Sequence, residues 1–561
     1  MGGAPGQFSS IQAAINAAKP GDWILVAPGD YKEHAALTPS GSSDQPAGVL
    51  ITTPGVRLRG MNRNKVIVDG TKPGSPACSS TESDQEVGPG ANGLNGILVW
   101  KANDVWVQNL TTCNFYKAAG NIWWNGGDGS GSIGGWGFSG SYITATNTFY
   151  KDERSAAQYG IFSSNWSGGT WDNAYASNFN DSGFYIGACQ QVCDQTVNRI
   201  WSEYNALGYS GSNSGGSLLI ENSQFDNNED GFDTNSQNGD NPPPQNGACP
   251  AGVKPPVAGA PSCWVFTHNY VHDNNNPNVP ALGSAAAGPV GTGMSVSGGR
   301  NDTIMDNTFT HNGAWGAIFV PYPDSGPPCT GGTNLPSLCL YDDYGDALLN
   351  NTFRGNGFFG NPTNGDVGAV NLEPGPTDCY SGNTDNGGSI SSSPGAIETL
   401  YPTCNGSTVA PNLNLVFLDE VACDSQAVSL GPLTGGTLCP PGASYPRRAQ
   451  VVMHPLPKQL GSMPNPCSGV PVNPWCAGGA TAMRACVARS FRVSLEVAVG
   501  ERFQSVSVRV RTAVRSYRAQ GRTATVRVKI RGRRARVKFI EWIKVNGHLE
   551  KITFTRIYHR C

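Results

Sequence analysis

Short apolar or alternating segments, each ended by Gly, Pro, Asn or Asp, follow one another along most of the chain. The first segment predicts an amphipathic helix, because apolar residues recur at helical spacing from Ile11 to Ala18. Ser9 or Ser10 can cap the start of this helix, and Pro20-Gly21 ends it. A buried strand is expected over 23–26, followed by further short β-rich pieces.

A short polar–aromatic unit then recurs, with Ser or Asn two positions before an aromatic or apolar residue. The units are Asn147/Phe149, Ser177/Phe179, Ser202/Tyr204, Ser223/Phe225, Asn269/Val271, Asn307/Phe309 and Asn351/Phe353. A single unit cannot bury its own apolar side chain, whereas stacked copies form a continuous core. The recurrence therefore predicts an all-β parallel β-helix, in which Asn residues at equivalent positions form hydrogen-bonded ladders. A large β-sandwich would not explain it.

Three insertions rich in Pro and Gly interrupt the repeat, at 235–263, 274–289 and 321–339. In a stacked-coil fold, insertions between repeats project from the coils and often form the walls of a binding face. We therefore expect a ligand site beside these segments.

The C-terminal part alternates apolar and basic residues with period two, as half-buried antiparallel strands do. We predict a β-helix over 1–445, a linker over 446–485 and a small antiparallel β domain over 486–561, closed by Cys486 and Cys561.

Charge is divided unequally between these parts. From Arg484 to Cys561 there are 20 Lys and Arg against 4 Asp and Glu, although the whole chain has a net charge of −3. The basic side chains expected on exposed strand faces are Arg509, Arg511, Arg527, Lys529, Arg536 and Lys538. Such a surface attracts anionic polymers, so we expect an acidic polysaccharide or a cell-envelope polyanion as partner, and no nucleic acid.

The cysteines indicate export. There are 16 of them, and none has the spacing of a zinc site. Most fall as close neighbours: Cys189 and Cys193, Cys249 and Cys263, Cys329 and Cys339, Cys379 and Cys404, Cys423 and Cys439. Local pairs of this kind indicate disulfides formed in an oxidising compartment, and so a secreted, extracellular or cell-surface protein. No segment is long and apolar enough to span a membrane. We expect a monomer.

The helix-then-strand start and the repeat together resemble the pectate-lyase-like superfamily of right-handed parallel β-helices. The resemblance implies that the first helix caps the end of the β-helix. The basic C-terminal part, with its final Tyr558-to-Cys561 segment, resembles small Arg-rich β domains of actinobacterial exported proteins, which further supports export.

The best candidate for chemistry is the turn "NNEDGFD", which gathers Glu229, Asp230 and Asp233. Crowded carboxylate oxygens are suitable ligands for Ca²⁺. The turn is similar to the calcium-binding "DDGFD" turn of family 9 pectate lyases, with Glu229 in place of the first Asp. That resemblance implies calcium-assisted β-elimination on a uronate, with a basic side chain that removes the ring proton.

Two features separate this chain from those lyases. Aligning "YNALGYS" with "NNEDGFD" places Leu207 and Ser210 in the coil before the acidic turn, and "GTGMSV" offers Thr292 and Ser295 in the coil after it. The carboxylates thus come from one coil, which predicts a weaker metal site.

The second feature concerns the base. No lysine lies between Lys254 and Lys458, so Arg300 and Arg354 are the candidates for the base, and His268 and His272 also lie one coil on.

Other interpretations stay open. The acidic turn is equally consistent with a solvated turn that binds nothing, or with a calcium ion that only rigidifies the coil. Asp230 and Asp233 are also a candidate carboxyl pair for a glycoside hydrolase. A non-catalytic surface or adhesion protein is the main alternative to an enzyme. The tryptophans fit either sugar-binding platforms or the coil interior.

Overall fold

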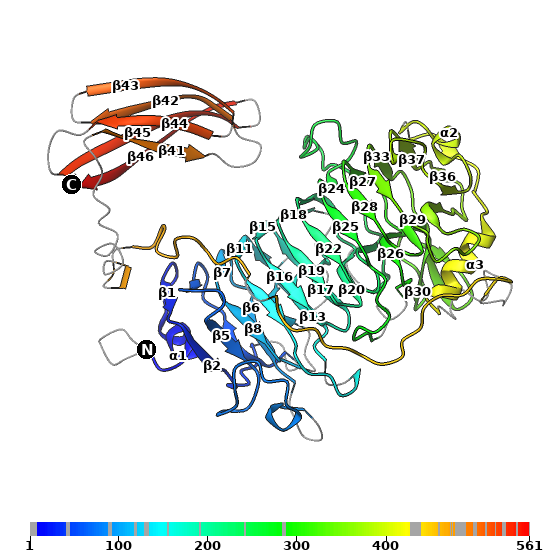
Figure 1. Cartoon of the computed structure of the whole chain (residues 1–561), viewed down its shortest axis with the longest axis horizontal. Helices are drawn as coiled ribbons and strands as arrows, with labels where there is room; N and C mark the ends of the chain where they lie inside the picture. The colour runs from blue at the N-terminus through cyan, green and yellow to red at the C-terminus, as the bar shows by residue number, and fades with distance from the viewer. Residues whose placement is uncertain are drawn as a thin grey trace. The chain divides into compact units, whose positions relative to one another are not determined.

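The computed structural model describes residues 8–40, 45–87, 93–116, 120–127, 134–153, 156–189, 192–239, 243–282, 288–404, 406–426, 439–457, 460–471, 473, 475–476 and the strands between 490 and 559. The chain divides into two compact units, 1–466 and 467–561. The first unit is a right-handed parallel β-helix, as the repeat predicts (Figure 1).

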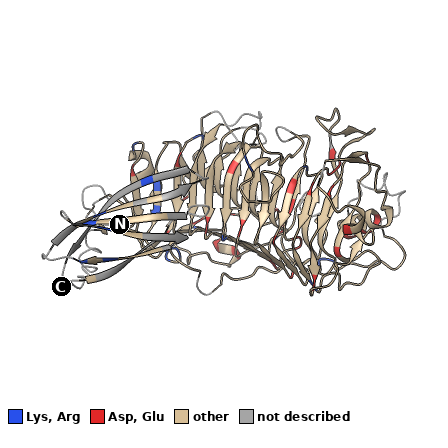
Figure 2. Cartoon of the chain, turned by 90° about the horizontal axis from the view of Figure 1, so that it is seen from above, with Lys and Arg blue, Asp and Glu red and all other residues tan. Residues whose placement is uncertain are grey.

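Three parallel sheets of eleven strands each run the length of this β-helix, and each coil contributes one strand to each sheet. In Figure 2 the strands of successive coils lie side by side. The first sheet contains β1 (Trp23–Val26), β4 (Arg57–Gly60), β7 (Val105–Gln108), β11 (Phe138–Ser141), β15 (Gly169–Asp172), β18 (Val192–Asn198), β21 (Gly216–Glu221), β24 (Trp264–Thr267), β27 (Asp302–Met305), β33 (Ala347–Leu349) and β37 (Cys379–Ser381).

The second sheet contains β2 (Gly29–Lys32), β5 (Val66–Asp69), β8 (Thr111–Cys113), β12 (Thr144–Thr146), β16 (Tyr175–Ser177), β19 (Trp201–Glu203), β22 (Gln224–Asp226), β25 (Tyr270–His272), β28 (Thr308–Thr310), β34 (Thr352–Arg354) and β38 (Thr384–Asp385). The third sheet contains β3 (Ala47–Ile51), β6 (Asn95–Trp100), β9 (Gly120–Asn125), β13 (Tyr159–Ser164), β17 (Ser182–Gly187), β20 (Leu207–Ser212), β23 (Asp233–Asn235), β26 (Thr292–Ser297), β29 (Trp315–Val320), β35 (Gly365–Ala369) and β39 (Ser392–Ser393).

Shorter elements close and decorate the coils. They are α1 (Ile11–Ala17), the 3₁₀ turn η1 (Glu82–Asp84), β10 (Gly135–Trp136), β14 (Trp166–Ser167), the hairpin strands β30 (Tyr322–Ser325), β31 (Thr333–Asn334) and β32 (Leu338–Tyr341), then β36 (Gly375–Pro376), α2 (Ile397–Leu400), β40 (Thr408–Val409) and α3 (Leu415–Asp424). The predicted first helix is confirmed: α1 starts after Ser10, whose hydroxyl accepts a hydrogen bond from the Ala13 amide at 3.1 Å.

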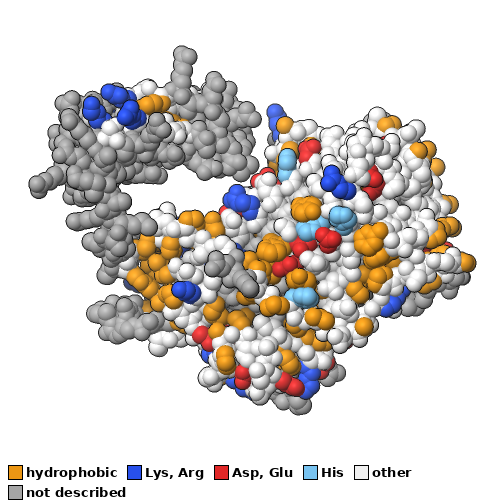
Figure 3. All heavy atoms as spheres, in the orientation of Figure 1, with side chains coloured by type: hydrophobic (Ala, Val, Ile, Leu, Met, Phe, Trp, Pro, Cys, Tyr) orange, Lys and Arg blue, Asp and Glu red, His pale blue; other side chains and the backbone are white. Residues whose placement is uncertain are grey.

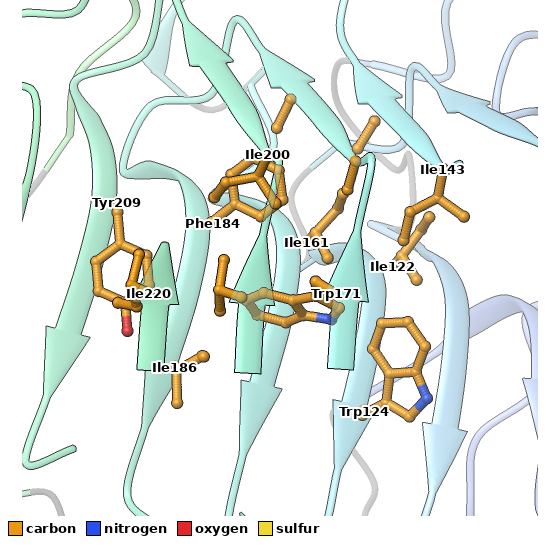
Figure 4. Packing of buried hydrophobic residues seen from close by; sticks show 14 of the residues in the cluster. Ile122, Trp124, Ile143, Ile161, Trp171, Phe184, Ile186, Ile200, Tyr209 and Ile220 are labelled. Atoms are coloured by element: carbon orange, nitrogen blue, oxygen red, sulfur yellow. The ribbon is translucent and has the colours of Figure 1, made fainter. Parts of the chain in front are cut away.

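The core is a column of inward-facing side chains that repeats from coil to coil. Ile122, Ile161, Phe184 and Tyr209 occupy the same position in consecutive strands of the third sheet (Figure 4). Trp124, Trp166 and Trp171 are buried in this column. Trp136, in contrast, is largely exposed, at 54%. Most of these rings therefore fill the coil interior and do not form sugar platforms.

Asparagine ladders follow the same stacking, as predicted. The amide oxygens of Asn307 and Asn351 accept hydrogen bonds from the backbone N–H and side-chain amide of the Asn one coil earlier, at 2.9–3.1 Å. The ladder continues through Asn383 and ends on the Glu398 carboxylate of α2. A buried donor and acceptor are thus satisfied in each of these coils, from Asn269 to Asn383.

The predicted repeat is correct in its last four units and wrong in its first three. Phe225, Val271, Phe309 and Phe353 are consecutive partners in the second sheet. Ser202, however, pairs with Phe225 and not with Ser223. The alignment of the repeat units differs in the earlier coils because Phe179 fills the interior at a corner where the next coil has Asn205. The Phe179 N–H donates to the Asn205 amide oxygen at 3.0 Å. A polar–aromatic pair thus occurs at two different positions of the coil.

The segment predicted as the start of a linker lies along the β-helix instead. We call 446–466 the strap. The backbone of His454 makes two hydrogen bonds to the Asn178 amide, and its ring stacks on Tyr204 at 3.7 Å. Further along, the Met463 N–H donates to the Asn109 side chain at 2.8 Å. Polar backbone groups of the strap find partners in the corners of the coils, so it belongs to the first unit.

The second unit contains the predicted antiparallel strands. They are β41 (Ser490–Glu496) paired with β44 (Thr523–Lys529), and a four-stranded sheet of β43 (Ala513–Gly521), β42 (Arg502–Val510), β45 (Arg534–Val545) and β46 (His548–His559). Val508 and Val526 are buried, while Arg509, Arg527, Lys529 and Lys538 are exposed, which confirms the alternation. Cys486, Cys561, Arg511 and the Arg536 side chain lie outside the described residues.

Seven disulfides join described cysteines, including all five predicted neighbour pairs. Cys78–Cys113 and Cys467–Cys476 are the two that the spacing did not predict. This number of disulfides is typical of proteins from oxidising compartments. Within the described part of the chain, no helix is long and apolar enough to cross a membrane.

Candidate active-site groove

A groove with a volume of about 490 Å³ lies over the outer face of the third sheet, and the acidic turn forms part of it. All three predicted insertions contribute: Gln237 from the first, Gly288 and Pro289 from the second, and Tyr322 with its two neighbouring prolines from the third. The three insertions therefore form part of the lining of one groove, and ligand binding there stays a prediction. Helix α3 adds Leu418 and Val421.

The floor of the groove is built from side chains at equivalent positions in consecutive strands. One row reads Phe162, Tyr185, Ser210, Asp233, Ser295 and Ile318 from β13 to β29. The register predicted from sequence is confirmed, because Asp233 lies between Ser210 and Ser295, and Asp230 lies between Leu207 and Thr292. Aromatic side chains thus lead along the groove to a carboxylate.

Asp230 and Asp233 are the carboxylates at the centre of the groove. Asp230 accepts hydrogen bonds from the Ser295 hydroxyl at 2.6 Å and from the Phe232 N–H at 3.2 Å. Asp233 accepts from the Ser297 hydroxyl at 2.9 Å and from the Asn235 amide. Burial raises the pKa of Asp233 to about 6. Burial, reinforced by the charge of Asp233, raises the pKa of Asp230 well above its ordinary value. Burial therefore favours the protonated form of both acids.

A third carboxyl, Asp181, lines the same groove two coils earlier. It accepts a hydrogen bond from the Gln158 amide at 3.3 Å, and burial raises its pKa to about 7. Nothing in the sequence singles it out, because "NDSG" is an ordinary turn sequence and Asp181 belongs to no acidic cluster in the chain. Only the stacking of coils brings it to the groove.

Glu229, the third residue of the predicted metal site, has different neighbours. Its Oε2 lies 3.7 Å from the Arg448 guanidinium of the strap. Burial raises the pKa of Glu229 to about 8, against the lowering effect of Arg448 and Arg447. Among the described residues, the three carboxylates whose oxygens gather within 4.8 Å are Asp343, Asp346 and Asp378, and not those of this turn. Calcium binding at Glu229, Asp230 and Asp233 stays a prediction.

The two arginines predicted as bases do not line the groove. Arg300 lies in the corner after β26, where its guanidinium donates to the Gly331 carbonyl at 3.0 Å and stacks on Tyr344. Arg354 ends β34 in the second sheet, exposed beside Asp385. In a three-sheet coil, a residue of the second sheet cannot reach the outer face of the third. Neither arginine is positioned to act on a ligand beside Asp233.

Hydrophobic rings form one end of the groove. Trp123 stacks on Phe162 with ring centroids 4.7 Å apart, and Tyr185 packs edge-on against Phe162 at 4.7 Å. Asn235 Oδ1 lies near the carboxylates and has no hydrogen-bond partner among the described residues. In the view of Figure 3, most of the described surface of the β-helix is uncharged, shown white and orange, with scattered acidic, basic and histidine side chains. Stacking surfaces beside unpaired polar atoms are suited to a sugar chain.

No family model and no curated protein matches the chain. It is similar to several solved structures. One is DFA-IIIase from Arthrobacter chlorophenolicus A6, with 12% identity over 73% of this chain and 89% of that one and a TM-score of 0.34. Another is the pectin methylesterase from Yersinia enterocolitica, with 13% identity over 68% and 92% and a TM-score of 0.22. A third is ORF18 of Geobacillus virus E2, with 12% identity over 67% and 56% and a TM-score of 0.28. The function is therefore inferred from the side chains of the groove itself.

Proposed function

We propose that this protein binds a polysaccharide chain in the groove over the third sheet and hydrolyses a glycosidic bond beside Asp230 and Asp233. The observation that carries the proposal is the pair of groove carboxyls whose pKa values burial raises to different extents. Glycoside hydrolases use two carboxyl groups, one protonated and one ionised, on either side of the bond that is cut.

The chemistry follows from these protonation states. Asp230, whose pKa burial and the charge of Asp233 raise well above its ordinary value, donates its proton to the leaving glycosidic oxygen. Asp233 ionises above about pH 6 and takes a proton from water as the water oxygen bonds to the anomeric carbon. The carbon–oxygen bond to the leaving sugar breaks in the same step. The Ser295 and Ser297 hydroxyls hold the two carboxylates in place.

Hydrolysis is favoured over β-elimination because of what the groove lacks. Its described lining contains no Lys and no Arg that would remove a ring proton or bind a uronate carboxylate. An elimination mechanism needs both functions. A groove lined by serine, asparagine and aromatic side chains instead favours a neutral or weakly charged sugar chain.

The test is release of reducing ends from a panel of neutral and acidic polysaccharides. Asp230→Asn and Asp233→Asn should each lower kcat by about 10²–10⁴-fold. Asp306→Asn is the matched control, because Asp306 is exposed, lies outside the groove and has a left-handed backbone (φ 57°) that Asn tolerates. Full activity in both groove variants would exclude the proposal. Products that absorb as unsaturated uronates would favour a lyase instead.

A second proposed function concerns the basic unit, which we infer binds an anionic polymer of the cell envelope. Arg509 of β42 lies directly opposite Lys538 of β45, and both side chains are exposed. Like charges opposite one another across strands destabilise a sheet, and a bound polyanion would offset that cost. Arg527 and Lys529 on β44, in the other sheet of this unit, are also exposed.

The binding test uses the full chain and a sulfated or phosphate-rich glycan. Arg509→Gln combined with Lys538→Gln should weaken binding at least tenfold, and added salt should weaken wild-type binding. Asp306→Asn, an exposed substitution in the β-helix, serves as the control. Binding that ignores both salt and the double substitution would contradict this proposal.

A further inference from the structure

A second group of carboxylates lies away from the groove, in the last coils of the β-helix. Asp346 and Asp378 directly precede β33 and β37, so they occupy the same corner in successive coils. Asp346 Oδ1 accepts a hydrogen bond from the Asp302 N–H at 2.7 Å, and Asp378 Oδ1 accepts from the Asp346 N–H at 2.8 Å. Asp343, just after hairpin strand β32, completes the group. The stacking of coils therefore forces like charges together.

The oxygens of this group converge. One oxygen each from Asp343, Asp346 and Asp378 lies within 4.8 Å of the others. Oxygens that share one Ca²⁺ ion at 2.3–2.6 Å lie at most about 5 Å apart. Those around the smaller Mg²⁺ ion, bound at 2.0–2.1 Å, lie at most about 4.2 Å apart. Oxygens within 4.8 Å of one another can share one divalent ion, and calcium is favoured because Mg²⁺ usually keeps several waters and is rarely held by protein oxygens alone.

Several of these oxygens are buried without a partner. Asp343 and Asp346 are 0% exposed and Asp378 is 4% exposed. Asp343 Oδ1, Asp346 Oδ2 and Asp378 Oδ2 have no hydrogen-bond partner among the described residues. Asp302 and Asp342 lie beside this group, and each has one buried carboxylate oxygen with no hydrogen-bond partner among the described residues. Buried carboxylates in proteins are normally paired with a cation or coordinate a metal.

The protein supplies little positive charge here. Arg300 influences Asp346 and Asp342 electrostatically, but no ion pair within 4.0 Å joins it to any of these carboxylates in the described part of the chain. Its guanidinium instead bonds to the Gly331 carbonyl and stacks on Tyr344. Without a cation, burial and mutual repulsion raise the pKa of Asp343 and Asp346 well above the ordinary range. A bound divalent ion would remove that repulsion.

We propose that Asp343, Asp346 and Asp378 hold one Ca²⁺ ion, with Asp302 and Asp342 beside it as supporting carboxylates. The ion fastens hairpin strand β32 to the corners of the last coils. Strand β32 pairs with β30, whose Tyr322 and Pro323 line the groove. The site is therefore structural, and it stabilises one wall of the groove.

The test measures calcium on the full chain. After dialysis against a chelator, wild-type protein should bind about one Ca²⁺ per chain by calorimetry and melt roughly 5 °C or more higher in excess calcium than in chelator. Magnesium should give a much smaller shift. Absence of any calcium-dependent shift or heat would overturn the proposal and would indicate that the carboxyl groups share protons instead.

Variants separate this site from the acidic turn predicted by sequence. Asp343→Asn and Asp378→Asn should abolish calcium binding and, in chelator, melt at or above the wild-type temperature, because each removes a buried negative charge. Asp233→Asn should keep calcium binding. The opposite pattern, with binding lost in Asp233→Asn and kept in Asp343→Asn, would move the ion to the turn and overturn the assignment.

Hydrogen exchange on wild-type protein gives a measurement that does not depend on the folding of a variant. Calcium should slow amide exchange over 338–346 and 371–379 and leave 229–235 unchanged. Slowing confined to 229–235 would overturn the proposal. The outcome is independent of the proposed hydrolase, because enzyme activity is not the readout.

Discussion

At the scale of single residues, the exposure of each carboxyl to water determines how far its pKa is raised. Asp233 is 8% exposed and Asp230 is fully enclosed, although both come from one short turn. The enclosed carboxyl holds its proton to higher pH, since the charged form is the one that burial disfavours. Asp230 and Asp233 thus differ in exposure although only three positions separate them in the chain.

This difference predicts the pH dependence of the proposed hydrolysis. Below about pH 6 the Asp233 carboxyl becomes protonated and loses its function as base, so kcat/KM should fall as pH is lowered through that value. Burial raises the pKa of Asp230 well above its ordinary value, so this carboxyl retains its proton to higher pH than an exposed aspartate does. The measurement is kcat/KM from pH 4 to 9. A profile that rises steadily towards pH 4 would contradict the assignment of Asp233.

At the scale of elements, ladders and straps hold the coils together. Each rung of the Asn269 to Asn383 ladder satisfies backbone and side-chain groups that water cannot reach. The strap adds a second set of contacts on the outside, from Asn278 in the later coils to Asn109 in the earlier ones. Figure 1 shows this segment crossing the coils in front of the sheets.

Interrupting the ladder should cost stability. Asn307→Ala removes the acceptor for two Asn269 donors and the donor to the Phe266 carbonyl, and leaves those buried groups unpaired. We expect a loss of about 2–3 kcal/mol in the free energy of unfolding, measured by urea denaturation. Asn386→Gly, at an exposed left-handed position (φ 49°), should stay near wild type. Equal stability of both variants would show that the ladder contributes nothing.

Releasing the strap should be a local event. The Asn278 side chain accepts hydrogen bonds from the amides of Ala449 and Gln450 at 3.0 and 3.3 Å. Asn278→Ala should speed hydrogen exchange at these two amides and leave the Met463 amide, held by Asn109, unchanged. Faster exchange along the whole strap would mean that it detaches as one unit, contrary to this prediction.

At the scale of the whole molecule, the parallel stack buries many carboxyl groups. Burial raises the pKa of five of them to about 6–8: Asp181, Glu203, Glu229, Asp233 and Asp342. The same groups titrate near pH 4 in the unfolded chain. Between about pH 4 and 8 the folded protein therefore holds more protons than the unfolded one.

The consequence is a stability that falls as pH rises through this window. These groups stabilise the folded state least above about pH 8, where both states are ionised and the buried charges are unpaired. Urea denaturation midpoints in chelator should be higher at pH 5 than at pH 8. Higher stability at pH 8 would mean that these carboxyls are paired with cations when ionised.

The sequence by itself determined the kind of fold, the capping helix, the local disulfides and the register of the acidic turn, because these depend on periodicity and on neighbours in the chain. Leu207, Ser210, Thr292 and Ser295 lie where the alignment of coils placed them. The alternation of buried and exposed residues in the C-terminal strands has the same origin.

The tertiary structure alone decided which groups share a site. Asp181 and Asp233, from different coils, line the same groove, and Asp346 and Asp378 lie together in another group of carboxylates. Glu229 instead lies beside Arg448, and Arg354 belongs to the second sheet. The reason is physical: residues 20 to 50 positions apart become neighbours only when the lengths of the intervening insertions set which coil each one enters. Burial, which fixes the protonation of every carboxyl discussed, exists only after those coils have stacked.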